Sequence, residues 1–352
     1  MKELVCPQGN LTSTKVEKRL EQLNAEIEAQ GIEVKKGRGH HKPEIVRERD
    51  ELALLYRRWM EYNRKKAICG ENRNSYSKTD TDATFMHMKD DHMRNSQLKP
   101  GYNVQFAVNS GFITGIGVFR NRTDFGTLIP FLTYLWHKHG KSYRDVVADS
   151  GYESLANYRW LFENGQTAFI KPANYESGKK RSSKEQVGRM ENMGYYEPDD
   201  CFICKNGRHL DLSFHYTSHA KDGTERKISI YRCEDCSDCP YRAACCKAKD
   251  SEKRKEIFVC WEFQNLRNNS YHNITTEEGK LLRCNRFIQA EGAFGQLKHN
   301  RNFKRFLTGG KVKVLAELLF LGLSQNIAHL LAKCNSGLQN LHLIQPKAYL
   351  NF

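Results

Sequence analysis

The sequence lacks any stretch that would export the chain or hold it in a membrane. Residues 1–20, MKELVCPQGNLTSTKVEKRL, contain no apolar segment of the length that a signal peptide needs. The longest apolar run, VLAELLFLGL at 314–323, contains Glu317 and is too short to span a bilayer. No tandem repeat of fixed period is visible either. We therefore expect a soluble, cytoplasmic protein with no membrane partner.

The sequence gives no support for a disulfide framework, although it contains 12 cysteines. Disulfides persist mainly in exported proteins, and the sequence carries no export signal. The cysteines are therefore expected to be reduced thiols, with metal binding as the alternative.

Acidic residues are in the minority. The chain of 352 residues has 56 lysines and arginines against 41 acidic residues, which gives a formal net charge of +15. This balance is typical of proteins that bind nucleic acid or another anionic surface. Lysines scattered over the surface can give the same net charge. The distribution of charge along the sequence must therefore decide whether nucleic-acid binding is indicated.

Residues 1–74 are expected to form a helical arm. In residues 14–30 the apolar side chains recur every three or four positions, as on one face of a helix. Residues 43–66 form a second predicted helix, and Pro43 suits its first turn. We expect the two helices to pack as a hairpin, or against the rest of the chain or another subunit. The predicted buried face of the second helix consists of Ile45, Leu52, Leu55, Trp59 and Met60.

Residues 75–175 contain short runs typical of strands, followed by strands that alternate with helices. The predicted order is β-β-β-α-β-α-β. The strands are 83–88, 102–108 and 112–119, then a strand within 144–154 and one at 166–171, with helices at 127–140 and 153–165. This order predicts an α/β (α+β) fold in which helices flank a mixed sheet.

After residue 175 the composition changes. Residues 173–200 are polar and charged, and are expected to form a flexible boundary. A Cys-rich β insertion is predicted over 176–274, centred on a hairpin whose strands flank Asp222-Gly223. Helices over 275–335 are expected to complete the first domain, the last of them buried because it is apolar on nearly all sides. Residues 336–352 form a tail.

Three acids stand out by position: Asp82, with Asp80 beside it, Asp149 and Glu291. Taken singly, each has an ordinary interpretation as a turn residue or a solvated helix side chain. Carboxylates at the ends of adjacent central strands point into one crevice, however, and a helix acid inside a cationic run completes the parts of a two-metal phosphoryl-transfer site. Such oxygen ligands suit Mg²⁺ or Mn²⁺.

The segments TDTDATFMHM, GYNVQFAVN, VVADSGYES and EGAFGQLKHNRNFKRF resemble, in order and spacing, the motifs of DDE-type bacterial insertion-sequence transposases. The resemblance covers about residues 75–335. It implies an RNase-H-like catalytic domain in which Asp149 and Glu291 are the second and third catalytic acids. DATF at 82–85 resembles the strand of the first acid, so Asp82 ranks first and Asp80 second. The resemblance also implies double-stranded DNA, at transposon ends and target, as substrate, and a homodimer.

Glu291 opens a basic segment. Lys298 follows it by seven residues, or two α-helical turns, so both side chains are expected on one face. This spacing is similar to the family's Glu-x6-Lys element, whose lysine contacts the DNA backbone. Phe287 replaces the arginine that the family carries four residues before the glutamate, and Arg286 lies one position off, which leaves its role open. Basic residues without intervening acids come next, and they suit binding to DNA phosphates. The alternative is that they form a solvated basic face. These residues are Arg301, Lys304, Arg305, Lys311 and Lys313.

Two C-x2-C pairs flank the predicted hairpin of the insertion, which is typical of a zinc ribbon. Further cysteines crowd the second pair, so the sequence does not fix which four would bind. Related transposases carry a Cys-containing insertion at this place. A structural Zn²⁺ thus competes with reduced thiols that hold no metal. The candidate ligands are Cys201, Cys204, Cys233, Cys236 and Cys239.

The resemblance also indicates a departure from the family. Full-length relatives carry a helical DNA-binding domain before the catalytic core, and the arm stands in its place here, which favours a truncated copy. The preferred hypothesis is a Mg²⁺-dependent DNA strand-transfer enzyme. The alternatives are an inactive remnant that only binds DNA, and an RNase-H-like nuclease of another purpose.

Overall fold

The structure is a computed structural model of the chain, and two compact units make it up, Met1–Thr81 and Asp82–Phe352. It describes residues 13–33, 41–70, 73–88, 96–220, 222–246, 248, 250, 253–300 and 302–337. The domain boundaries predicted at 175, 275 and 336 stay predictions.

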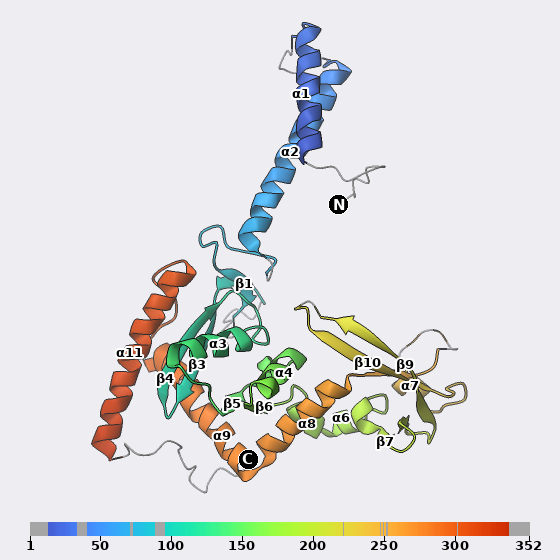
Figure 1. Cartoon of the computed structure of the whole chain (residues 1–352), viewed down its shortest axis with the longest axis vertical. Helices are drawn as coiled ribbons and strands as arrows, with labels where there is room; N and C mark the ends of the chain where they lie inside the picture. Colours follow the sequence, from blue (N-terminus) through green and yellow to red (C-terminus); the bar gives the residue numbers. More distant parts are fainter. Residues whose placement is uncertain are drawn as a thin grey trace. The chain divides into compact units, whose positions relative to one another are not determined.

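The first unit contains two helices, α1 (Ser13–Ala29) and α2 (Glu44–Cys69), which pack against each other (Figure 1). Arg19 of α1 and Glu48 of α2 form an ion pair of 3.0 Å. The predicted buried face of the second helix is wrong in part, because Leu55, Trp59 and Met60 are exposed. The reason is length: α1 has 17 residues and α2 has 26, so α2 extends beyond its partner.

The first part of the second unit has the predicted order of elements, with one additional strand, β2. Its elements are β1 (Thr84–His87), β2 (Leu98–Gly101), β3 (Asn103–Asn109), β4 (Phe112–Phe119), α3 (Leu128–His139), β5 (Asp145–Ala148), α4 (Leu155–Glu163) and β6 (Thr167–Ile170). Strands β1 and β2 pair antiparallel, as do β3 and β4, whereas β5 and β6 pair parallel. The strands therefore form three two-stranded ladders. This mixed α/β arrangement is consistent with an RNase-H-like fold.

An apolar cluster holds β5 and β6 against the helices. Leu128 of α3, Val146 of β5, Leu161 of α4 and Ile170 of β6 are all buried in it. The α4 helix begins with Ser154 as its N-cap, whose hydroxyl accepts the N–H of Asn157 at 3.1 Å. This cluster fixes the end of β5, which Asp149 directly succeeds.

The Cys-rich insertion is one antiparallel sheet in the order β11-β10-β9-β8-β7. Its strands are β7 (Gly194–Tyr196), β8 (Cys201–Ile203), β9 (His209–His219), β10 (Glu225–Cys233) and β11 (Glu256–Val259), and the short helix α7 (Arg242–Cys245) comes after β10. The predicted hairpin is confirmed, because β9 and β10 pair around Gly223, whose φ is 82°. The expected flexible boundary instead contains the helices α5 (Tyr175–Lys179) and α6 (Arg181–Lys184), held by Asn192 and Arg189, which bond to Ser183.

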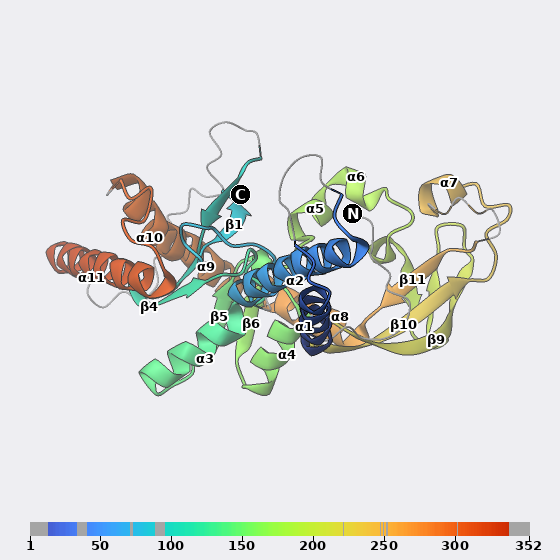
Figure 2. The same ribbon diagram turned by 90° about the horizontal axis from the view of Figure 1, so that it is seen from above.

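A run of helices returns the chain from the insertion (Figure 1). It comprises α8 (Trp261–Thr275), α9 (Glu277–Arg286), the π-helical turn η3 (Phe287–Glu291), α10 (Gly292–Gly295), a second π-helical turn η4 (Gln296–Asn300) and α11 (Lys311–Ser336). Figure 2 shows the β9–β10 hairpin and α11 at opposite ends of the second unit. Thr276 separates α8 from α9 and caps α9 by accepting the N–H of Gly279 at 3.0 Å.

The α11 helix is only half buried, so the prediction of a buried helix is wrong. Val314, Leu318 and Gly322 face the core, whereas Phe320 and Leu331 are exposed. Among the described residues it is the single helix whose length and composition would suit a membrane span. Its contacts with β4 include two 2.8 Å hydrogen bonds between the Asn326 side chain and the backbone of Ile113.

We predict that Asn157→Ala lowers the free energy of unfolding by about 2 kcal/mol, because it leaves two carbonyl oxygens without a donor. Asn157 is 1% exposed, and its Nδ2 donates to the carbonyls of Phe125 at 2.8 Å and Tyr152 at 2.6 Å. Urea unfolding measures the change. The control is Asn164→Ala at the exposed end of α4, which we expect to change stability by less than about 0.5 kcal/mol. Equal effects at both positions would contradict this role.

Candidate functional site

Asp149 lies directly after β5, at the position that the sequence predicted. Its side chain is exposed, and its Oδ1 accepts the N–H of Ser150 at 2.8 Å, which caps the short helix η1 (Ser150–Tyr152). Asp149 is thus held by the backbone while it faces solvent, as a ligand-binding carboxylate must.

Tyr152 connects Asp149 with two other charged groups. Burial raises the pKa of the Tyr152 phenol most, the negative charges of Asp124 and Asp149 raise it further, and the positive charge of Arg286 opposes them. The three charged groups therefore lie within electrostatic range of this phenol. Asn157 joins the same segments, since its amide binds the carbonyls of Phe125 and Tyr152. The segments carrying Asp124 and Asp149 are therefore clamped together.

Glu291 is half exposed and pairs with Arg286, whose Nη2 donates to Glu291 Oε1 at 3.0 Å. The two residues are five apart, which matches the i→i+5 period of a π-helix rather than an α-helix. They span η3, the π-helical turn. A π-helical turn contains more residues than an α-helical turn. It therefore places Arg286, five residues before Glu291, on the same side of the helix as the acid. Arg286 therefore contacts the third acid, although the sequence left its role open.

The helical segment around Glu291 is anchored on the β3–β4 hairpin. Phe294 stacks on Phe106 of β3, with ring centroids 4.2 Å apart and planes at 8°. Ala293 is buried in the cluster formed with β4 and α11. Gln289 Oε1 accepts the N–H of Gly111 in the turn between β3 and β4 at 3.0 Å. These contacts fix Glu291 relative to the strands.

Asp82 lies just before β1 and is half buried. One carboxylate oxygen accepts the backbone N–H of Lys311 at 2.9 Å, at the first turn of α11, and the other pairs with Arg120. Helix N-termini favour such a carboxylate. Asp82 thus has a structural role that the sequence did not predict. Asp80 is half buried and belongs to the first unit, whereas Asp82 begins the second.

Asp124, in the segment between β4 and α3, is a carboxylate that the sequence did not single out. Its Oδ1 accepts Asn103 Nδ2 at 2.7 Å and Gln105 Nε2 at 3.1 Å, both from β3. A Cβ added to Gly151 would lie 3.1 Å from Asp124 Oδ2, so the glycine permits this carboxylate to approach the turn after Asp149. In sequence, Asp124 is an ordinary acid before a helix, and no spacing distinguishes it.

Four acids of the second unit are candidates for the site, and contacts link the segments that carry two of them, Asp82 and Asp124. Arg120, which binds Asp82, succeeds Phe119, and Phe119 pairs with Asn103, which donates to Asp124. The four acids are Asp82, Asp124, Asp149 and Glu291. Their oxygen donors are hard ligands of the kind that Mg²⁺ or Mn²⁺ prefers. Their chemistry suits such a cation, but among the described residues no three of these acids have oxygens within 4.8 Å of one another.

The basic residues beyond Glu291 lie beside aromatic anchors. Phe303 and Phe306 contact each other with centroids 5.3 Å apart and pack in the cluster with β4 and α11. Lys304 and Arg305, between them, are exposed. Glu317 of α11 fastens the next residues by accepting the N–H groups of Leu307 and Thr308. This arrangement presents the two cations outward.

Lys298 is exposed and lies in η4. The two-turn arithmetic that placed it on the face of Glu291 assumed a uniform α-helix, which η3 and η4 interrupt. Lys311 and Lys313, in the first turn of α11, are exposed. Arg301 lies outside the described residues.

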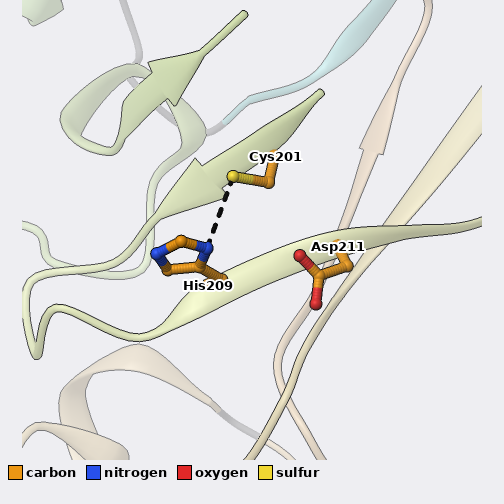
Figure 3. A group of neighbouring side chains, drawn as sticks. All are labelled: Cys201, His209 and Asp211. Carbon is orange, nitrogen blue, oxygen red and sulfur yellow. Dashed lines mark hydrogen bonds between the residues drawn. The ribbon is translucent and has the colours of Figure 1, made fainter. Parts of the chain in front are cut away.

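The structure divides the predicted zinc ligands. Cys201 Sγ lies 3.6 Å from His209 Nδ1, and these atoms and an Asp211 oxygen are all within 4.8 Å of one another (Figure 3). The other four, Cys204, Cys233, Cys236 and Cys239, line a separate cavity. Cys201 and Cys204 separate because positions three apart along an extended strand point to opposite faces. Cys201 is therefore not placed with the other predicted ligands.

Residues 203–331, a little over a third of the chain, match the family described as "Transposase DDE domain". This match confirms the resemblance to DDE-type transposases. It includes Glu291 and most of the cysteines of the insertion, and it begins after Asp149. Comparisons with curated proteins and with solved structures give no match.

We predict that Asp149→Asn and Glu291→Gln each weaken Mn²⁺ binding at least about tenfold, because each removes a hard oxygen ligand. Electron paramagnetic resonance of free Mn²⁺ during titration gives the affinity. Glu277→Gln is the matched control, since Glu277 lies at the exposed start of α9 with a side chain 91% exposed. Unchanged affinity in both site variants would rule out a shared cation.

Proposed function

We propose that this chain, which carries a transposase DDE domain, cleaves DNA at the ends of an insertion sequence and transfers the freed strands to target DNA. The observation that carries the proposal is that Asp149 and Arg286 both act electrostatically on Tyr152, while Arg286 forms an ion pair with Glu291. It supports one carboxylate site formed by a strand end and a helix far apart in sequence. Mg²⁺ or Mn²⁺ is the proposed cofactor.

Asp149 and Glu291 are the proposed metal ligands, with Asp82 as the first acid and Asp80 as its alternative. Divalent ions held by these carboxylates would supply activation of the attacking oxygen and charge stabilisation of the leaving oxygen. Asp124 lies beside Asp149 and would add negative charge to the same site. The chain supplies position and charge and needs no covalent nucleophile, since water and then a DNA 3′-hydroxyl are the attacking groups.

The proposed DNA contacts are basic side chains near Glu291. Arg286 can exchange its pairing with Glu291 for a phosphate when a cation takes the carboxylate, because guanidinium binds both anions in the same geometry. Lys298, Lys304 and Arg305 are exposed and would contact the backbone. Arg301 is proposed from its sequence position alone. A homodimer that pairs two DNA ends, in the cytoplasm and on the nucleoid, completes the proposal.

A second candidate function is DNA binding without cleavage, as expected of an inactive remnant. Two contacts favour it: Arg120 pairs with Asp82, and Arg286 pairs with Glu291. If these ion pairs persist when DNA binds, the carboxylates cannot ligate a cation. The two functions differ in whether the chain cleaves DNA when a divalent metal is present.

We expect cleavage of labelled transposon-end DNA that requires Mg²⁺ or Mn²⁺, and products in which the ends are joined to a target plasmid. Asp149→Ala should lower the cleavage rate by about a thousandfold or more, because a ligand that stabilises the transition state is lost. Asp145→Ala is the control, since Asp145 begins the same strand and pairs with Arg144 away from the site. Metal-dependent cleavage without joined products would indicate a nuclease instead. Binding without cleavage would support the second candidate.

We predict that Arg305→Ala lowers the slope of log binding constant against log salt concentration by about one unit, because one phosphate contact is lost. Fluorescence anisotropy at a series of salt concentrations measures the slope. Arg181→Ala is the control, because Arg181 is 92% exposed in α6 and pairs only with Glu185 among the ion pairs described. An equal slope for Arg305→Ala and the unaltered chain would exclude this contact.

A further inference from the structure

The insertion contains a small cavity that thiols surround. Its volume is about 20 Å³, close to the space that a single small ion or water needs. It lies where the turn between β8 and β9, the loop after β10 and helix α7 meet. The six thiols are Cys204, Cys233, Cys236, Cys239, Cys245 and Cys246.

Four of the six thiols occupy its inner wall. Cys204, Cys233, Cys236 and Cys245 also pack in the apolar cluster of the insertion, around Phe202 and Tyr231. Cys204 and Cys236 lie within electrostatic range of both Cys233 and Cys245, whereas Cys239 lies within range of Cys245. Cys239 and Cys246 line the cavity outside that cluster. Cys204 and Cys236 are therefore the centre of a group of four.

The surroundings of the four thiols suit negative charge. Cys236 Sγ accepts the backbone N–H of Lys255 at 3.4 Å. Arg208, Arg242 and Lys255 line the same cavity, together with Asp235, which pairs with Arg208 at 2.6 Å. Arg242 also donates to the carbonyls of Cys236 at 3.2 Å and of Lys253 at 3.0 Å, which ties the chain around the cavity. Four thiolates on a divalent ion carry a net negative charge, and these cations would offset it.

We propose that Cys204, Cys233, Cys236 and Cys245 bind one structural Zn²⁺. This site differs from the set that the sequence suggested, because it excludes Cys201 and Cys239 and includes Cys245. It is independent of DNA cleavage. Zn²⁺ holds four thiolates tetrahedrally with Zn–S distances of about 2.3 Å. Among the described residues, Cys201, His209 and Asp211 form the only group of three whose donor atoms lie within 4.8 Å of one another. The four sulfurs are therefore more widely spaced in this structure and would move closer together on binding the ion.

The architecture of the insertion gives the ion a structural role. The insertion is one sheet with a small apolar cluster of its own, and domains of this size commonly need a metal or disulfides to supplement the core. Cys233 ends β10 and Cys204 follows β8, on the two sides of β9, whereas Cys236 lies in the loop after β10 and Cys245 lies in α7, both outside the sheet. A tetrahedral ion would fasten these segments at the base of the long β9–β10 hairpin.

The trio at Cys201 is the rival site and is less suited to a structural ion. It offers one thiol, one imidazole and one carboxylate from the pair of strands β8 and β9 (Figure 3). Cys201 and Asp211 pair across these strands, and His209 lies two residues from Asp211 on the same face. Two nearby strands already hold each other through their hydrogen bonds, so an ion there would join nothing new.

The experiment measures zinc in the purified full-length chain and in cysteine variants by plasma mass spectrometry. We expect about one zinc per chain, and a fall of about tenfold or more in Cys204→Ser, Cys236→Ser and Cys245→Ser. Cys239→Ser, Cys201→Ser and His209→Ala should keep the ion. Cys239→Ser is the closest control, because its thiol lines the same cavity.

A second measurement does not depend on how the variants fold. Co²⁺ replaces zinc in the unaltered chain, and its absorption spectrum reports the number of coordinating thiolates. A four-thiolate spectrum is expected. A one-thiolate spectrum, loss of zinc in Cys201→Ser or His209→Ala with retention in Cys204→Ser, loss of zinc in Cys239→Ser with retention in Cys245→Ser, or no zinc in the unaltered chain would each overturn the proposal.

Discussion

The stacking of Phe294 on Phe106 is the contact on which the geometry of the candidate site depends. Glu291 is separated from Asp149 by more than a hundred residues and by the whole insertion, so the chain itself does not hold them together. The aromatic pair, the buried Ala293 and the bond from Gly111 to Gln289 seat the helix on the hairpin of β3 and β4. The insertion can then vary without moving the acid.

Charge compensation is the second constraint on the site. Carboxylates gathered at one edge repel one another unless cations lie among them. Arg120 compensates Asp82, Arg286 compensates Glu291, and amide groups of Asn103 and Gln105 hold Asp124. The same arginines neutralise the acids and can bind phosphate.

The sequence predicted the local elements better than their surroundings. Strand alternation, the turn at Asp222-Gly223 and the helix patterns depend on neighbours in sequence, and the structure has these elements. The face that an element buries depends on the partner that covers it. For this reason Trp59 and Phe320 are exposed although their helices are strongly apolar on one side or more.

The candidate site shows the same division. Asp149 and Glu291 were predicted because motifs carry them; Asp149 and Arg286 both act electrostatically on Tyr152, and Arg286 pairs with Glu291. Asp124 was not predicted, since its role depends on hydrogen bonds from β3 and on a glycine two residues after Asp149. Cys201 was predicted as a ligand because spacing alone does not tell a strand from a turn. Cys201 begins β8, which ends at Ile203, and the next residue, Cys204, lines the thiol cavity, whereas Cys201 does not.

The π-helical turn before Glu291 places Arg286 beside the acid. In a regular α-helix, Arg286 and Glu291 would be five residues and about 500° apart, so the arginine would point away from the acid. The π-turn η3 reduces the rotation per residue and returns Arg286 to the face of Glu291. Such turns are less stable than α-helix and persist where function or packing requires them. Here the π-helical turn η3 keeps Arg286 beside Glu291, although the two residues are five positions apart.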